Sequence, residues 1–188
     1  MEFQITFDYL CPFARNANEA VLNGLAAGRE WKVNFRPFSL TQVHRGEADA
    51  FDDRSASGVL ALHWGIAARE VDPDNFYAVH RALFAARHDK GLDIRDEDVL
   101  VAAVEEAGGD VDAIAKAVAS GEPAELLRTE HQQAVERWEV FGVPTFIVGD
   151  EAVFVRLMSR GEPADVDRVL ELVGYTDLNE FKRTRIPR

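Results

Sequence analysis

One cysteine is the residue in this chain with the clearest capacity for chemistry. Cys11 is the only cysteine among 188 residues, and Pro12 follows it directly. Proline is favoured at the first position of a helix, because its missing N–H would have no partner there. We therefore expect Cys11 at a helix start, where the N–H groups of Phe13 and Ala14 and the helix dipole favour a thiolate and lower the pKa. The alternative is a buried, inert cysteine.

The residue three positions after Cys11 limits what this thiol can do. A dithiol enzyme attacks with one cysteine and resolves the mixed disulfide with a second. Ala14 stands at the position of the second thiol, so an internal disulfide is excluded. Cys11 can still attack a disulfide, and an external thiol such as glutathione or mycothiol would then release it. Alternatively, the protein holds a small thiol beside Cys11 without covalent chemistry.

The segments around Cys11 follow a strand–helix–strand order. Apolar residues alternate with polar ones over residues 3–9, which predicts a strand. Apolar residues recur every four positions over residues 12–27, and Gly28 is a plausible helix stop. Residues 31–38 form a second expected strand, which Pro37 ends. Such an order forms a right-handed unit with parallel strands.

The middle of the chain shows helical periodicity and no strand pattern. Prolines, acidic residues and glycines mark the breaks between five expected helices, at residues 57–70, 73–90, 96–107, 110–119 and 123–140. The strand pattern returns at residues 144–148 and 152–155, which are close enough to form a hairpin. A last helix is expected at residues 163–173. The predicted order is βαβ, a helical block, then ββα.

Composition and charge exclude several classes of protein. The formal net charge is −12, which repels nucleic acid phosphates and anionic lipids, so we expect neither nucleic acid nor a membrane as partner. No apolar run is long enough to span a bilayer, and the N-terminus does not resemble a secretory signal. A single cysteine agrees with a reducing compartment, so a cytoplasmic location is expected.

One expected helix carries a regular face of aromatic residues and histidines. Phe76, His80, Phe84 and His88 recur at steps of four within residues 73–90. A histidine among phenylalanines is typical of a hydrogen-bonded core residue, and the alternative makes His80 a polar group near a substrate. The five histidines and one cysteine show no spacing typical of metal ligands, so no metal site is expected.

Two motifs carry a resemblance to a known family. CPFA at residues 11–14 stands in place of a Cys-Pro-x-Cys motif, and GVPTF at residues 142–146 follows about 130 residues later. With the helical block between them, they resemble the DsbA-like branch of the thioredoxin superfamily over nearly the whole chain. Kappa-class glutathione transferases and 2-hydroxychromene-2-carboxylate isomerases share this architecture, but they replace the reactive cysteine with serine and use glutathione.

The resemblance assigns roles to further residues. It makes Val143, Pro144 and Thr145 the cis-proline segment, whose backbone would pair with an extended substrate or a small thiol. Without the resemblance, Pro144 would be an ordinary trans proline at the start of an edge strand. Several relatives carry an acidic residue near the position of Asp8. That residue could cap the helix or hold the loop, and a solvated strand position is the alternative.

The resemblance implies an α/β protein with a thioredoxin-like fold (βαβ…ββα) and a large all-helical insertion. Residues 1–54 and 142–188 would form the two halves of the thioredoxin-like domain, and residues 55–141 would form the insertion.

Three functions agree with these features. The first is thiol–disulfide exchange by Cys11 as a monothiol, acting on small-molecule or protein disulfides with glutathione or mycothiol as resolving co-substrate. The second is a glutathione- or mycothiol-dependent transferase or isomerase. The third is a redox-inactive binding protein on the same fold. No pattern specifies the oligomeric state, and a homodimer is left open.

Overall fold

A four-stranded mixed sheet forms the centre of the protein. The computed structural model describes residues 1–46 and 48–185. The strands β1 (Glu2–Phe7), β2 (Lys32–Pro37), β3 (Thr145–Val148) and β4 (Glu151–Phe154) lie in the order β2-β1-β3-β4. β1 pairs in parallel with β2 and antiparallel with β3, and β4 returns antiparallel to β3. The first and last parts of the chain therefore share one sheet.

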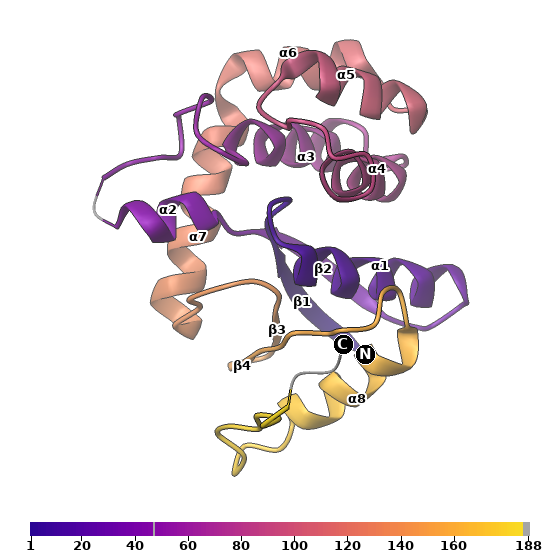
Figure 1. Cartoon of the computed structure of the whole chain (residues 1–188), viewed down its shortest axis with the longest axis vertical. Coiled ribbons are helices and arrows are strands. Elements are labelled where there is room, and N and C mark those ends of the chain that lie inside the picture. Colours follow the sequence, from indigo (N-terminus) through magenta and orange to yellow (C-terminus); the bar gives the residue numbers. More distant parts are fainter. Residues whose placement is uncertain (47, 186–188) are drawn as a thin grey trace.

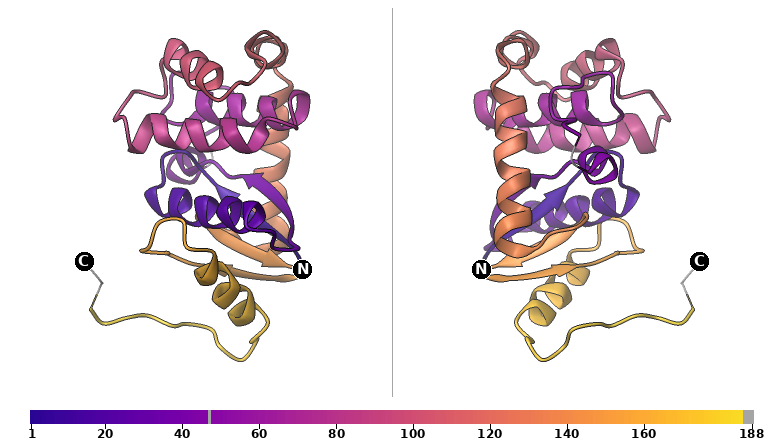
Figure 2. Two further views of the ribbon diagram at one scale, coloured as in Figure 1. Left: turned by 90° about the vertical axis from the view of Figure 1, so that its right-hand side faces the viewer. Right: turned by 90° about the vertical axis from the view of Figure 1, so that its left-hand side faces the viewer.

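Helices surround this sheet in two groups (Figure 1). α1 (Pro12–Ala26) and α8 (Pro163–Val173) pack against each other and contact the sheet. The second group lies between β2 and β3 in the chain and comprises α3 (Val59–Val71), α4 (Phe76–His88), α5 (Glu97–Glu106), α6 (Val111–Ser120) and α7 (Glu122–Trp138). Figure 2 shows α3–α6 gathered at the end opposite α8, and α7 running from them alongside the sheet.

The fold agrees with the thioredoxin-like architecture that the sequence predicts, and every expected strand and helix is present. One helix was missed: α2 (Leu40–Arg45), which follows β2. Ser39 caps it by accepting a hydrogen bond from the Gln42 N–H at 3.1 Å. Six residues are too few to show a helical period, so only this capping serine marked the helix in the sequence.

The helical group is fixed to the Cys11 loop through a buried tyrosine. Tyr9 is 0% exposed, and its hydroxyl forms a hydrogen bond of 2.8 Å with His80 Nδ1. Its backbone oxygen accepts a hydrogen bond from His88 Nε2 at 2.9 Å. Both histidines belong to α4, so these two hydrogen bonds join the helical group to the loop that carries Cys11. Among the described residues, no helix is long and apolar enough to cross a membrane.

Tyr9 also needs the glycine of α3 beside it. A Cβ atom added at Gly65 would lie 2.2 Å from the Tyr9 hydroxyl oxygen. We predict that Gly65→Ala lowers the free energy of unfolding by about 1–3 kcal/mol, because the overlap outweighs the gain of about 1 kcal/mol in helix propensity. Urea denaturation measures this change. Gly174→Ala is the matched control, since its nearest neighbouring atom would lie 3.6 Å away. A stabilised Gly65→Ala variant would contradict the prediction.

Candidate functional site around Cys11

Cys11 caps the N-terminus of α1. Its backbone is extended, with φ of −92° and ψ of 116°, and Pro12 occupies the first turn of the helix. The Sγ atom accepts a hydrogen bond from the Ala14 N–H at 3.4 Å. The Cys11 residue is only 8% exposed, whereas Pro12 is exposed beside it. The sulfur therefore lies just below the surface, at the end of the helix where N–H groups are free.

The segment before β3 closes over the other side of the sulfur. The Cys11 thiol donates a hydrogen bond to the Val143 carbonyl oxygen at 3.4 Å, across 132 positions of sequence. The Val143–Pro144 peptide bond is cis. Thr145 fixes this segment, because its N–H donates to Thr6 Oγ1 and its hydroxyl donates to the Gly142 carbonyl, both at 2.8 Å. Thr145 is buried, so its side chain fixes this segment from inside the protein and is not available to solvent.

The pKa of the thiol corrects one expectation from the sequence. The pKa of Cys11 is raised, because burial disfavours the charged thiolate more than the N–H groups of Ala14 and Phe13 favour it. The charge of Asp8 raises this pKa further, and Arg156 lowers it. The expected lowering considered only the helix start and left out burial, which depends on contacts with residues distant in sequence such as Val143.

Asp8 holds the loop before Cys11. Its side chain accepts hydrogen bonds from the Leu10 N–H at 2.9 Å and the Leu40 N–H at 2.8 Å. Its backbone oxygen accepts a third, from the Cys11 N–H at 3.0 Å. Burial raises the pKa of the carboxyl to about 6, against the effect of the two side-chain bonds. Asp8 therefore orders the loop from inside the protein and is not the solvated strand residue of the alternative interpretation.

A cation and three aromatic rings lie next to this loop. The Arg156 guanidinium lies 5.6 Å from the ring centre of Phe13 and 5.6 Å from that of Phe154. The Phe154 ring is in turn 5.1 Å from the ring of Phe141, which is 68% exposed. Sequence reasoning did not select Arg156, Phe141 or Phe154. Arg156 lies beside Phe13 because the antiparallel pairing of β3 with β4 returns the chain toward the Cys11 loop, which local sequence does not show.

His80 lies in the core. It is 0% exposed, and its Nε2 atom forms a hydrogen bond of 3.1 Å with Asn18 Oδ1, while its Nδ1 atom is bonded to Tyr9. Aromatic rings pack around the imidazole, among them Phe7 and Phe84. Burial lowers the pKa of His80 to about 3. This position fits the expected hydrogen-bonded core residue, whereas the alternative interpretation, a polar group in contact with a substrate, is not supported by it.

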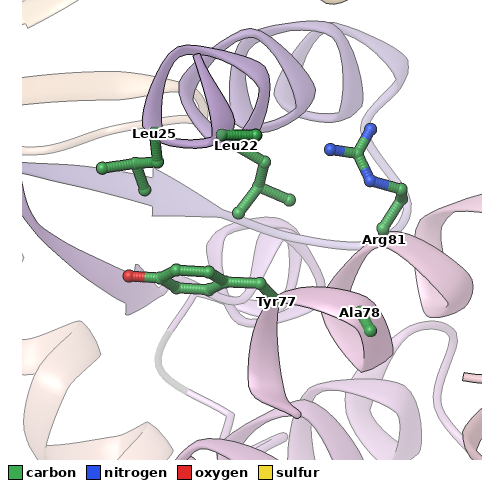
Figure 3. Close-up of a pocket in the computed structure, with 6 residues that line it drawn as sticks. Leu22, Leu25, Tyr77, Ala78 and Arg81 are labelled. Carbon is green, nitrogen blue, oxygen red and sulfur yellow. The ribbon is translucent and has the colours of Figure 1, made fainter. Parts of the chain in front are cut away.

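A surface groove lies apart from the site, between α1 and α4 (Figure 3). Leu22, Leu25 and Ala26 line it from α1, and Tyr77, Ala78 and Arg81 line it from α4. Its walls contain no residue of the Cys11 loop and no cysteine, serine or threonine. Within residues 1–46 and 48–185, no three histidine, cysteine or acidic side chains are grouped so that they could hold a metal ion.

We predict that Cys11 ionises above the ordinary pKa of a cysteine. The rate of iodoacetamide labelling of the native protein, followed against pH by intact mass, should rise with a midpoint above that of free cysteine. Asp8→Asn removes a negative charge and should lower the midpoint, whereas Asp150→Asn, whose native side chain is 86% exposed, should leave it unchanged. A midpoint below that of free cysteine would contradict the burial argument.

The buried histidines predict a loss of stability in acid. Burial lowers the pKa of His80 to about 3 and that of His131 to about 4, from 6.5 when exposed. The unfolded chain therefore binds more protons below pH 6.5, and the stability present above that pH is lost as the pH falls. Asp8 has the opposite effect, because its raised pKa lets the folded protein bind a proton more readily than the unfolded chain does. Asp8 is one group and the histidines are two, so the loss of stability is larger than this gain. Urea denaturation should show a free energy of unfolding lower by about 1–3 kcal/mol at about pH 5 than at about pH 7. An equal free energy of unfolding at these two pH values would contradict the prediction.

Comparison with known structures supports the fold. A 2-hydroxychromene-2-carboxylate isomerase aligns with a TM-score of 0.67 and 19% identity, covering 94% of this chain and 98% of that chain. The cytosolic disulfide reductase DsbM from Pseudomonas aeruginosa, in a structure with GSH, aligns with a TM-score of 0.66 and 16% identity, covering 95% and 100%. A thioredoxin-like oxidoreductase from Silicibacter pomeroyi aligns with a TM-score of 0.61 and 19% identity, covering 93% and 86%.

No curated protein matches the sequence. A family model does match, that of the DSBA-like thioredoxin domain, over residues 3–161. The match includes Cys11, the whole helical group and the segment from Val143 to Thr145. The chain belongs to the DSBA-like thioredoxin family.

Proposed function

We propose that this protein is a thiol–disulfide exchange enzyme in which Cys11 acts as a monothiol and an external small thiol resolves the reaction. The observation that carries the proposal is the placement of one thiol between the Ala14 N–H and the Val143 carbonyl, at the surface end of α1. Ala14 follows in the position of a second thiol. The membership of the family and the enzymes among the similar structures support an enzyme of this type.

The reaction balances without an internal disulfide. The Cys11 thiolate attacks one sulfur of a disulfide, the Cys11–sulfur bond forms, the old sulfur–sulfur bond breaks, and the second sulfur leaves as a thiolate that takes up a proton. The thiolate of a free small thiol then attacks the mixed disulfide and regenerates Cys11. These two steps release one half of the disulfide as a thiol and join the other half to the small thiol in a new mixed disulfide. A second small thiol that attacks this mixed disulfide releases the other half, so two small thiols are oxidised to their own disulfide for each disulfide that is fully reduced. In this proposal the substrate lies against the backbone of Val143 and Pro144, while Thr145 holds that segment from inside the protein.

The raised pKa of Cys11 favours reduction over oxidation of substrates. A strongly oxidising thiol enzyme has a stabilised reduced thiolate, which requires a depressed pKa. Burial of Cys11 produces the opposite shift. We therefore favour the reducing direction, in which the electrons come from a small thiol of a reducing compartment such as the cytoplasm. The DsbM structure, that of a cytosolic disulfide reductase with GSH, agrees with this direction and with glutathione as a co-substrate.

The same observation also favours a second candidate. A thiol that stays protonated can donate a hydrogen bond to a bound small thiol without reacting with it, as a glutathione-dependent transferase or isomerase would require. The similarity to 2-hydroxychromene-2-carboxylate isomerase supports this candidate. The two candidates differ in one respect: whether turnover needs the sulfur of Cys11.

We predict that a second cysteine would convert the monothiol into a dithiol enzyme. Glutathione disulfide should leave a stable single adduct on the native protein, detected by intact mass. In Ala14→Cys, the new thiol can attack the mixed disulfide and release glutathione without added thiol. The intact mass should then be that of the reduced variant less two hydrogens, because an internal disulfide has formed. Ala14→Ser is the matched control and should keep the adduct.

Cys11→Ser separates the candidates. This variant should form no adduct and lose disulfide reductase activity. No adduct on the native protein at a pH that ionises Cys11 would contradict the exchange reaction. Turnover of an electrophile or isomerisable substrate that survives Cys11→Ser would support the second candidate instead.

A further inference from the structure

Arg156 is held beside the reactive sulfur by the rings of Phe13 and Phe154. It follows β4, whereas Phe13 stands two residues after Cys11 in the first turn of α1. Both ring centres lie 5.6 Å from the guanidinium carbon. Contact with aromatic faces restrains an arginine while its N–H groups stay free for hydrogen bonds. The Arg156 residue is exposed, so a molecule that reaches Cys11 from solvent can reach this cation too.

Within the part of the chain that the structure describes, no acidic side chain pairs with Arg156, which sets it apart from its neighbours. The Arg160 guanidinium, four residues later, forms ion pairs with Glu19 and Asp89, and Arg15 also pairs with Asp89. Among residues 1–46 and 48–185, no hydrogen bond or ion pair involves the Arg156 side chain. The chain has 33 acidic residues and 21 basic ones, so acidic partners are abundant. An unpaired cation near the thiol is therefore a local exception to the acidic character of the chain.

Arginine binds carboxylates through two parallel N–H···O bonds. We propose that Arg156 selects thiols and disulfides that carry a carboxylate, by pairing with that carboxylate while their sulfur lies at Cys11. This inference rests on the proposed function and names the class of its co-substrate. Glutathione carries two carboxylates, and mycothiol, a thiol built on sugars, carries none. Arg156 thus favours glutathione or a similar acidic thiol over mycothiol.

The charge of Arg156 also acts on the thiol. A positive charge nearby favours the thiolate, and Arg156 lowers the pKa of Cys11 against the larger effect of burial. A substitution at Arg156 will therefore change the reactivity of Cys11 toward every disulfide. Only the ratio of rates between disulfides of different charge reports on recognition of the carboxylate.

The first experiment measures the rate of adduct formation at Cys11 with three disulfides. Glutathione disulfide is anionic, bis(2-hydroxyethyl) disulfide is neutral and cystamine is cationic. In Arg156→Gln, the ratio of the anionic to the neutral rate should fall about 5- to 10-fold, the size expected for loss of an exposed charged hydrogen bond. Arg156→Glu should invert the preference toward cystamine, and added salt should narrow the ratio of the anionic to the neutral rate in the native protein.

Arg168→Gln, the matched control on α8, should keep the native ratio. An unchanged ratio in Arg156→Gln overturns the proposal.

The second experiment removes the reaction from the test. S-methylglutathione cannot exchange, so its binding to the Cys11→Ser protein by calorimetry reports on recognition alone. Adding Arg156→Gln should weaken this binding about 5- to 10-fold. No binding to Cys11→Ser, or equal binding to both proteins, overturns the role of Arg156. If Cys11 of the native protein reacts with none of the three disulfides, the exchange function fails, while the S-methylglutathione measurement still decides the role of Arg156.

Discussion

Antiparallel pairing of β1 with β3 is the constraint on which both the fold and the site depend. It joins Gln4 to Ile147 and Ile5 to Phe146, segments that lie far apart in the chain. The Thr145 N–H bonded to Thr6 Oγ1 continues this contact to the strand ends. β1 leads directly into the Cys11 loop, and the Val143 segment leads directly into β3. Without this pairing, the thiol would have a helix end on one side and solvent on the other.

Two opposing effects act on Cys11, and their balance follows from this arrangement. N–H groups at a helix start stabilise a thiolate, while enclosure by protein removes the water that would also stabilise it. At Cys11 the second effect is larger, and the thiol donates its proton in a hydrogen bond to Val143. Arg156 and Asp8 act in opposite directions on the same pKa. Burial is therefore the largest effect on the pKa of Cys11, the N–H groups of Ala14 and Phe13 come next, and the charges of Asp8 and Arg156 make smaller adjustments.

The helical group contributes rigidity to the site. His80 and His88 of α4 hold the side chain and the backbone of Tyr9, two residues before Cys11. On the other side, Asp89 pairs with Arg15 of α1 and with Arg160 of the loop after β4. Asn16 of α1 donates to the Leu157 carbonyl at 3.0 Å and so fixes that loop, which also carries Arg156. The residues around the thiol are thus positioned by helix α4 as well as by the sheet.

The order of strands and helices follows from the sequence, because alternation of apolar residues and helical periodicity are local properties. The sequence by itself also determined the single thiol, the missing partner at Ala14 and the start of α1 at Pro12, since each depends on neighbouring residues. The short helix α2 was not predicted from the sequence, because six residues carry too little periodic signal. The pKa of Cys11, the partners Tyr9 and Asn18 of His80, and the grouping of Arg156 with Phe13 and Phe154 depend on the tertiary structure. Each depends on contacts between segments far apart in the chain. Such contacts determine how deeply a residue is buried, which local sequence patterns do not show.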